Sequence, residues 1–356
     1  MWVEFASIQA FKIMSSDLVC GDDLKMSENS PPGERKIIDL IVRKLHKMPH
    51  MPIPFGDDIS GMDIGAGRIA VLKSDMLVAR TDIPRGMGLR QAARKAVVMN
   101  VSDFASKGVQ PRAVMVSLGL PRSTTVSDVE EIAAGLDEAS REYGAYVIGG
   151  DTNECDDLVI ACYLFGTAER KRVVERSGAK PGDLVAVTGE FGNTIAGLKL
   201  LETETDIPQR VRTALLASVY DPKARLKEGI ALARARALTA SMDSSDGLAW
   251  SLHEISRASS VGMELHDVPV SAATLEYSRV SGVDPLDLAL YGGEEFELVV
   301  CLKKNAAKRA LRSVRSLHII GSVTKDAGTV TLVRDGTRTA IEPRGWEHLS
   351  SNPPRS

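Results

Sequence analysis

The stretch Ala145-Tyr-Val-Ile-Gly-Gly-Asp-Thr152 predicts a strand that ends at a bound ligand. An apolar, β-prone run stops there at two glycines, and an aspartate and a threonine follow at once. Glycine has no Cβ, so the backbone can lie close to a ligand or adopt unusual dihedral angles. A carboxylate at such a strand end suits a Mg²⁺ ion that carries phosphate oxygens. Because Gly-Gly-Asp is more often only a turn, the interpretation depends on similar aspartates elsewhere in the chain.

The composition indicates a soluble globular protein of two domains. The chain has 356 residues, 44% of them hydrophobic and 26% charged, which is too long for one ordinary core. A net charge of −3 gives no electrostatic case for nucleic acid or an anionic membrane. No apolar run approaches the ~20 residues of a membrane span. The four cysteines form no Cys-x-x-Cys pair, so neither a zinc site nor a disulfide framework is indicated, and a cytoplasmic location is expected.

The domain organisation follows from composition along the chain. The first 25 residues lack the features of a signal peptide, and a Ser- and Pro-rich stretch after Met26 precedes the first helix. The segment Arg176–Asp183 is rich in Gly and Pro, which is typical of a domain boundary. We expect a poorly ordered extension over 1–26, an N-terminal domain over 27–170, a C-terminal domain over 171–337 and a tail over 338–356.

Helices and strands alternate within each predicted domain, which indicates an α+β fold. The residues at 69–72 and 76–79 are expected to form a short hairpin around Ser74-Asp75, where a metal ligand is equally plausible. Helices are predicted over 34–47, 89–107 and 126–143, with another beginning within 222–229. The remaining strands are predicted over 113–120, 158–167, 184–188, 297–302 and 329–333.

The helix predicted over 89–107 is apolar almost all the way round, so it should be buried. Asn100 and Asp103 are the exceptions, and they share one face because they lie three residues apart. Burying a lone carboxylate costs folding free energy unless the carboxylate is paired or bound to a cation. Asp103 is therefore either in a salt bridge with Arg94 or Lys107, or a metal ligand.

Two further turns have both a structural and a functional interpretation. The glycine-rich turn over 189–198 enters a helix, and it is either a phosphate contact or a site of close packing. It matches neither a Walker loop nor GxGxxG. The second turn, Asp243-Ser-Ser-Asp246, also leads into a helix. Ser245 or Asp246 taken alone is typical of an N-cap, whereas Asp243 and Asp246 together resemble a cation site.

Six acidic stretches, most of them beside Gly, Ser or Thr, make a common site plausible. Carboxylates gathered without His or Cys favour hard cations, above all Mg²⁺. Several such ions are needed where several phosphates must be neutralised while one is transferred. No Ser–His–Asp or Cys–His constellation competes, and the six histidines are taken as structural or surface residues. The stretches are Asp57/Asp58, Asp75, Asp103, Asp151, Asp243/Asp246 and Glu294/Glu295.

The chain resembles the thiamine-monophosphate kinase family, in the superfamily of aminoimidazole ribonucleotide synthetase and selenophosphate synthetase. The resemblance runs from about Gly33 to Trp346 and rests on the order and spacing of seven motifs. They are Phe55-Gly-Asp-Asp58, Ser74-Asp75, Asn100-Val-Ser-Asp-Phe-Ala-Ser-Lys-Gly108, Ile148-Gly-Gly-Asp-Thr152, Arg176-Ser-Gly-Ala-Lys-Pro-Gly-Asp183, Asp243-Ser-Ser-Asp-Gly-Leu248 and Gly292-Gly-Glu-Glu-Phe-Glu-Leu298.

The resemblance implies ATP- and Mg²⁺-dependent phosphorylation of thiamine monophosphate to thiamine diphosphate by in-line transfer of the γ-phosphate. The family's fold implies an N-terminal mixed α/β domain whose sheet pairs with its twin in a homodimer. A C-terminal α/β sandwich domain would close the nucleotide cleft.

The same resemblance assigns roles to individual residues. Its Mg²⁺ ligands correspond to Asp58, Ser74, Asp75, Asp103, Asp151, Asp243 and Asp246, of which Asp103, Asp151 and Asp246 carry catalysis through the metal without a general base. Its ATP contacts correspond to Gly150, Asp151, Arg176 and Ser245. Its thiamine contacts correspond to Glu294 and Trp346.

Three departures from the family pattern bear on the acceptor. Asp82-Ile83 stands where a histidine and an aromatic residue are usual, so Asp82 takes the place of an expected substrate contact. Glu295-Phe296 replaces Asp-Tyr, and Ser244 replaces an apolar residue. There are two alternatives. One is a sister enzyme that acts on another small acceptor, such as a ribonucleotide. The other is a catalytically silent protein that binds ATP or thiamine phosphate. No cysteine lies in the glycine-rich N-terminal stretch, which disfavours a selenophosphate synthetase.

Overall fold

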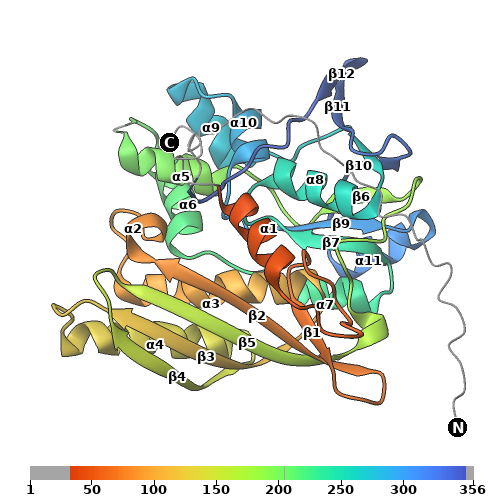
Figure 1. Cartoon of the computed structure of the whole chain (residues 1–356). Helices are drawn as coiled ribbons and strands as arrows, with labels where there is room; N and C mark the ends of the chain where they lie inside the picture. The colour runs from red at the N-terminus through yellow and green to blue at the C-terminus, as the bar shows by residue number, and fades with distance from the viewer. Residues whose placement is uncertain (1–32, 204, 350–356) are drawn as a thin grey trace, which may run out of the picture.

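The computed structural model describes residues 33–203 and 205–349, and the expectation for the 1–26 extension lies outside them. Within these residues the chain forms one five-stranded and one seven-stranded sheet with helices packed around them (Figure 1). The predicted α+β class is confirmed. None of the helices described is long and apolar enough to cross a membrane.

The five-stranded sheet is built from the N-terminal half in the order β1-β2-β5-β3-β4. The strands β3 and β4 run parallel, whereas the other neighbours are antiparallel. The elements are α1 (Glu34–Lys44), β1 (Ser60–Asp63), β2 (Arg68–Val78), α2 (Ala79–Asp82), α3 (Leu89–Ser106), β3 (Pro111–Leu120), α4 (Val126–Glu142), β4 (Tyr146–Glu154), β5 (Val159–Glu169) and the 3₁₀ turn η1 (Arg170–Arg172).

The hairpin predicted around Ser74-Asp75 is wrong, because β2 is a single strand. Its register with β5 runs without a shift from Arg68 opposite Glu169 to Val78 opposite Val159. No Gly, Pro or Asn interrupts β2, so continued pairing outweighs the weak local turn signal. The hairpin lies one step earlier, between β1 and β2.

Helix α3 is the buried helix that the sequence predicts, and it joins the two halves of the molecule. Thirteen of its 18 residues are buried. It packs on α4 and β2 within the N-terminal half and on α7 (Leu226–Arg234) and β7 (Leu238–Asp243) of the C-terminal half. Any side chain that leaves α3 toward β7 therefore enters the junction between the halves.

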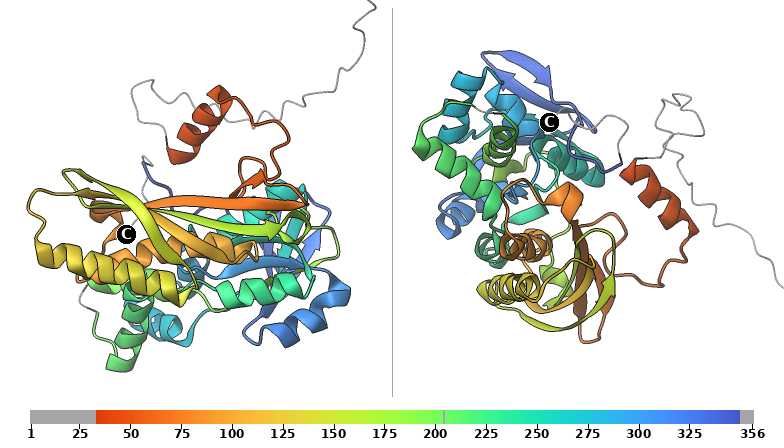
Figure 2. Two further views of the ribbon diagram at one scale, coloured as in Figure 1. Left: turned by 90° about the horizontal axis from the view of Figure 1, so that it is seen from below. Right: turned by 90° about the vertical axis from the view of Figure 1, so that its left-hand side faces the viewer.

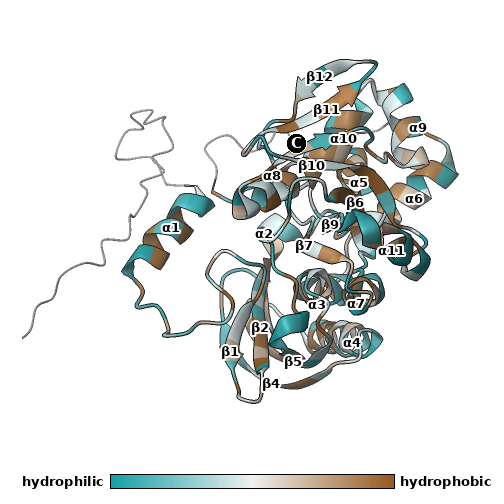
Figure 3. Ribbon diagram, turned by 90° about the vertical axis from the view of Figure 1, so that its right-hand side faces the viewer, coloured by the Kyte–Doolittle hydropathy of each residue, from teal (hydrophilic) through white to brown (hydrophobic). Residues whose placement is uncertain are grey.

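The face of the five-stranded sheet opposite α3 and α4 is exposed and apolar. Figure 2 shows the two helices on one side of the sheet and helix α1 on the other. Hydrophobic segments are visible on β2 in Figure 3. We call this the outer face; its exposed apolar side chains are Leu72, Met76, Met115, Tyr163 and Phe165.

The seven-stranded sheet is built from the C-terminal half in the order β12-β11-β8-β10-β6-β9-β7. Helix α7 begins at Leu226, within the predicted start region of 222–229. The other elements are β6 (Leu184–Val187), α5 (Asn193–Glu202), α6 (Gln209–Tyr220), α8 (Leu248–Ser259), β8 (Gly262–Leu265), α9 (Ala272–Ser281), α10 (Pro285–Tyr291), β9 (Leu298–Leu302), η2 (Lys304–Ala306), α11 (Ala307–Ser313), β10 (His318–Thr324), β11 (Val330–Arg334) and β12 (Thr337–Ala340).

Candidate active site

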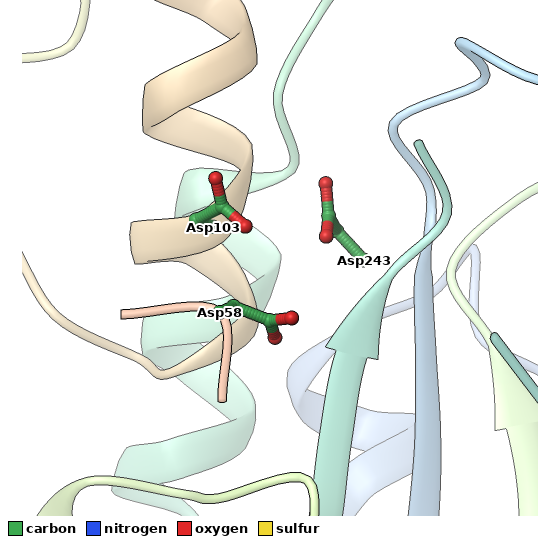
Figure 4. A group of neighbouring side chains, drawn as sticks. All are labelled: Asp58, Asp103 and Asp243. Atoms are coloured by element: carbon green, nitrogen blue, oxygen red, sulfur yellow. The ribbon is translucent and has the colours of Figure 1, made fainter. Parts of the chain in front are cut away.

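Three aspartates from distant parts of the sequence meet at the junction of the two halves. Asp58 lies in the loop before β1, Asp103 on α3 and Asp243 at the end of β7. All three are buried, and one carboxylate oxygen of each lies within 4.8 Å of the other two. Figure 4 shows the three carboxylates directed toward a common point. We call them the aspartate cluster.

Asp58 is already matched by positive charge. The Nζ of Lys107 lies 2.6 Å from its Oδ2, and the guanidinium of Arg176 pairs with its Oδ1. Ser106 donates a further hydrogen bond at 3.0 Å. Burial alone would raise the pKa of Asp58, but Lys107 and Arg176 hold the pKa below its usual range. Asp58 is therefore ionised and already fully occupied by donors.

Asp103 pairs with a residue that the sequence did not suggest. Its Oδ2 lies 3.0 Å from the Nζ of Lys73 on β2, so the predicted bridge to Arg94 or Lys107 is wrong. Arg94 instead pairs with acidic residues of α4 and the α6–α7 loop. Burial still raises the pKa of Asp103 well above its ordinary value, because Lys73 compensates only part of the desolvation cost.

Asp243 has the least compensation of the three. Its Oδ2 accepts a hydrogen bond of 2.6 Å from the Ser102 hydroxyl. Within residues 33–203 and 205–349, no lysine or arginine forms an ion pair with it. Burial and the nearby Asp58 charge raise the pKa of Asp243 to about 7.

The donor set of the aspartate cluster fits a hard divalent cation. Its three ligands are carboxylates without any thiolate or imidazole, which suits Mg²⁺ rather than zinc. The raised pKa values of Asp103 and Asp243 mark negative charge that the protein's own cations leave uncompensated. A divalent ion between them would supply the missing charge.

Two residues predicted to contact the acceptor, Glu294 and Trp346, lie at the turn that follows Asp243. Ser245 and Asp246 form the turn between β7 and α8, and Gly247 allows this turn because its φ is +116°. The N–H of Trp346 donates to the Asp246 carbonyl at 2.9 Å, and that of Glu294 donates to the Ser245 carbonyl at 2.6 Å. Burial raises the pKa of Asp246 to about 6. The C-terminal tail thus packs on this turn.

Glu294 is held by a buried lysine that the sequence analysis missed. The Nζ of Lys95 on α3 lies 2.6 Å from a Glu294 carboxylate oxygen and donates to the Asp82 carbonyl at 2.8 Å. Only 2% of the Lys95 side chain is exposed. A lysine among alanines and valines on a buried helix face was the available signal, since such a lysine requires a partner.

Arg176 and Asp82 are engaged by protein groups in this structure. Arg176 donates to Asp58 and to the Gly56 carbonyl, and it pairs with Glu254 at 3.3 Å. The carboxylate of Asp82 accepts the N–H of Val78 at 2.7 Å and so stabilises the short helix α2. Each side chain would have to give up one of these contacts to bind a ligand.

Ser74 and Asp151 lie away from the aspartate cluster. Side chains alternate along a strand, so Lys73 and Asp75 face α3 while Ser74 lies on the outer face. In the sheet register, Ser74 lies opposite the exposed Tyr163 of β5. Asp151 lies on the exposed edge strand β4, opposite Ser117 of β3. A single chain therefore does not bring these two predicted ligands to the other aspartates.

Gly150 and the glycine-rich turn over 189–198 have structural explanations. A Cβ on Gly150 would lie 1.8 Å from the carbonyl oxygen of Val116 on β3, so only glycine permits this strand pairing. At the start of α5, the N–H groups of Gly192 and Thr194 donate to Glu295 at 2.8 and 3.0 Å. An internal carboxylate thus occupies the helix end that phosphate was one candidate to fill.

Comparison with known proteins places the chain in a family. Residues 56–168 match the model "AIR synthase related protein, N-terminal domain", and residues 180–333 match its C-terminal counterpart. The thiamine-monophosphate kinase of Nitrosopumilus maritimus is 37% identical over 283 residues, which are 78% of this chain and 89% of the relative. That of Pyrococcus horikoshii is 38% identical over 282 residues, covering 78% and 86%. The chain belongs to the thiamine-monophosphate kinase family.

Solved structures agree with this family assignment. AaThiL complexed with AMPPCP and TMP superposes with a TM-score of 0.78 at 31% identity, covering 89% of this chain and 97% of that one. Thiamine monophosphate kinase from Aquifex aeolicus gives 0.74 at 29% identity, covering 85% and 97%. The hydrogenase maturation protein HypE gives 0.66 at 21% identity, covering 85% and 96%, and shows a common fold only. The resemblance stated from the sequence is confirmed, and with it the enzyme class, a phosphotransferase.

Proposed function

We propose that this protein transfers the γ-phosphoryl group of ATP to thiamine monophosphate and releases thiamine diphosphate and ADP. The observation that carries the proposal is the aspartate cluster beside the turn that joins Ser245, Glu294 and Trp346. A polyphosphate site and an acceptor site would then adjoin at the junction of the two halves. The relative complexed with AMPPCP and TMP, which matches 89% of this chain, supports this assignment.

The chemistry requires positioning and charge neutralisation rather than proton abstraction. The acceptor is a phosphate oxygen that is already ionised at neutral pH, so no general base is needed. In-line transfer through a loose transition state places charge on the transferred group and the leaving oxygen. Buried carboxylates from a loop, a helix and a strand can hold cations in fixed positions for this charge.

Asp58, Asp103 and Asp243 would hold Mg²⁺, with Asp75 and Asp246 beside them. Bound Mg²⁺ would neutralise the β- and γ-phosphate oxygens during transfer. Asp243 is the ligand with the least competition, because no cationic side chain among the described residues is paired with it. Asp58 would have to exchange part of its contact with Lys107 or Arg176 for the ion. Arg176, once released, would reach nucleotide phosphates.

Glu294 and Trp346 would recognise the cationic thiamine moiety. Trp346 is 40% exposed, so its ring is accessible to a ligand, and an aromatic face attracts a cation. The Glu294 carboxylate is also partly exposed despite its pairing with Lys95. Lys95 fixes the carboxylate in place through its 2.6 Å contact.

We further propose that the outer face pairs with its counterpart in a homodimer. Five exposed apolar side chains on one sheet face favour burial against a second copy. Ser74 and Asp151 lie on that face, so pairing would bring them close to the second chain, where they could complete its metal and ATP site.

For the single chain we propose an N-terminal domain over 27–170 and a C-terminal domain over 171–337. The ATP requirement and the three cysteines among the described residues, all of them free, suit a cytoplasmic protein.

The proposal is tested by incubating the purified protein with Mg²⁺, ATP and a panel of phosphorylated acceptors. The expected result is thiamine diphosphate and ADP in equal amounts, and no product when EDTA removes the metal. ATP turnover with a ribonucleotide but not with thiamine monophosphate would contradict the proposal and indicate a sister enzyme. ATP binding without any turnover would indicate a silent binding protein.

A further inference from the structure

Lys73 lies inside the acidic region, between two carboxylates from different elements. Its Nζ is 3.1 Å from Asp75 Oδ1 and 3.0 Å from Asp103 Oδ2. About one fifth of the Lys73 side chain is exposed, and nine tenths of that of Asp103 is buried. The ammonium therefore occupies a position where two carboxylates of the proposed metal set converge.

The strand geometry places Lys73 and Asp75 on the same face of the sheet. Lys73 and Asp75 are two residues apart on β2, so both side chains leave the strand on the face that α3 covers. The register of β2 with β5 is uninterrupted on both sides of them. Asn100 on α3 accepts the N–H of Asp75 at 2.9 Å, which fixes β2 against α3 at this point. The ammonium can leave the region only if the Lys73 side chain adopts another rotamer that points toward solvent.

The protein's own cations are distributed unevenly over the acidic residues. Asp58 has two cationic partners, Lys107 and Arg176. Asp75 and Asp103 share only Lys73. Lys73 is thus the one cationic side chain that, among the described residues, bridges these two carboxylates. In its place a divalent ion would contact the same two oxygens.

We propose that Lys73 is a tethered cation of the active site, whose ammonium takes the position between Asp75 and Asp103 that a divalent ion would otherwise fill. The inference rests on the proposed metal-dependent function of the aspartate cluster. It adds that the chain itself supplies one of the charges that face the nucleotide, and that Lys73 sets how many divalent ions the site binds. Lys73 is therefore a positioning residue for the metal ions and the phosphates, and it takes no part in breaking or forming bonds.

The decisive experiment counts bound Mn²⁺, a spectroscopic substitute for Mg²⁺, by electron paramagnetic resonance on the full-length protein without nucleotide. Lys73→Met removes the ammonium and keeps most of the side-chain volume. The variant should bind one more Mn²⁺ than the wild type, or bind the same number with at least a tenfold lower Kd. Lys73→Arg keeps the charge and should match the wild-type count.

Lys171→Met is the matched control. Lys171 is an exposed lysine in η1, beyond the end of β2 that is remote from Asp75. Among residues 33–203 and 205–349, its ion pair is with Glu169 alone. Its replacement changes the net charge by the same amount, so it should leave Mn²⁺ binding unchanged. Melting temperatures with EDTA and with Mn²⁺ show whether Lys73→Met folds; the variant should melt lower in EDTA and gain more from Mn²⁺ than the wild type.

Each outcome decides the inference separately from the proposed function. An unchanged or reduced Mn²⁺ count in a folded Lys73→Met protein would overturn it, even if thiamine diphosphate is still formed. A gain in Mn²⁺ binding that Lys171→Met reproduces would also overturn it, because net charge alone would then explain the gain. A gain specific to Lys73→Met supports it even if the acceptor proves to be another molecule.

Discussion

Two stretches of this chain have nearly the same local sequence and opposite surroundings. Ile148-Gly-Gly-Asp151 lies on the edge strand β4, whose nine residues are all exposed. Gly292-Gly-Glu-Glu295 lies in the connection from α10 to β9, where Glu294 takes a φ of +62° and pairs with buried Lys95. The first stretch offers its carboxylate to whatever approaches the outer face. The second has both carboxylates bound by groups of the same chain.

The glycines of the two stretches differ in the same way. Gly150 is required by contact with the neighbouring strand, whereas nothing lies within 4 Å of a Cβ placed on Gly149. Gly292 and Gly293 are both confined, since a Cβ on them would approach Ile195 at 2.5 Å and the Ser245 carbonyl at 2.8 Å. A Gly-Gly-acid pattern therefore marks a backbone constraint in both places, but its meaning depends on what packs there.

The largest effect is expected from removing the charge of the exposed stretch. Asp151→Asn should lower turnover at least about 100-fold if this carboxylate completes a metal site. Its melting temperature should not change, because Asp151 is exposed and forms no ion pair among the described residues. Asp156→Asn, an exposed neighbour, is the control in steady-state assays. Full activity of Asp151→Asn would show that this Gly-Gly-Asp is only a strand edge.

A second effect concerns the surface around Asp151. Met76→Glu places a charge on the outer face, where Met76 is 61% exposed, and should shift a homodimer to monomers by sedimentation. The control is Val126→Glu on α4, which is 77% exposed on the side away from this face. If the wild type is monomeric, or if both variants remain dimeric, the outer face is not the interface.

A smaller effect separates the two glycines of the exposed stretch. Gly150→Ala should lower the free energy of unfolding by about 3 kcal/mol or more, because its Cβ would overlap the Val116 carbonyl. Gly149→Ala meets open space and should cost less than about 1 kcal/mol. Urea unfolding measures both. Equal values for the two variants would contradict the register of β3 and β4.

The smallest effect concerns the pH dependence of the confined stretch. Burial raises the pKa of Glu295 from 4.5 to about 7, despite the Thr194 and Gly192 N–H donors. When the pKa of a carboxyl is higher in the folded than in the unfolded state, the protein loses folding free energy as pH rises from about 4.5 to about 7. Glu295→Gln should remove that loss, so its free energy of unfolding above pH 7 should exceed that of the wild type by on the order of 3 kcal/mol. The exposed Glu190→Gln should keep the wild-type profile of unfolding free energy against pH.

Much of the candidate site could be predicted from residue type alone. Asp58, Asp103 and Asp243 are acidic residues in or beside apolar segments, and burying a carboxylate requires a partner. The sequence also predicted that α3 is buried, since its polar residues are too few for a solvent face. It did not predict Lys73 and Lys95 as partners, because both contacts join elements distant in the chain.

The sequence by itself determined the mixed α and β character of the fold, the absence of His and Cys from the acidic stretches, and the family. Only the tertiary structure decided which carboxylates meet. Successive side chains of a strand leave it on opposite faces, so one residue of register separates Ser74 on the outer face from Asp75 toward α3. Pairing with β5 sets that register, and the packing of α3 between the two halves brings Asp103 to Asp58 and Asp243.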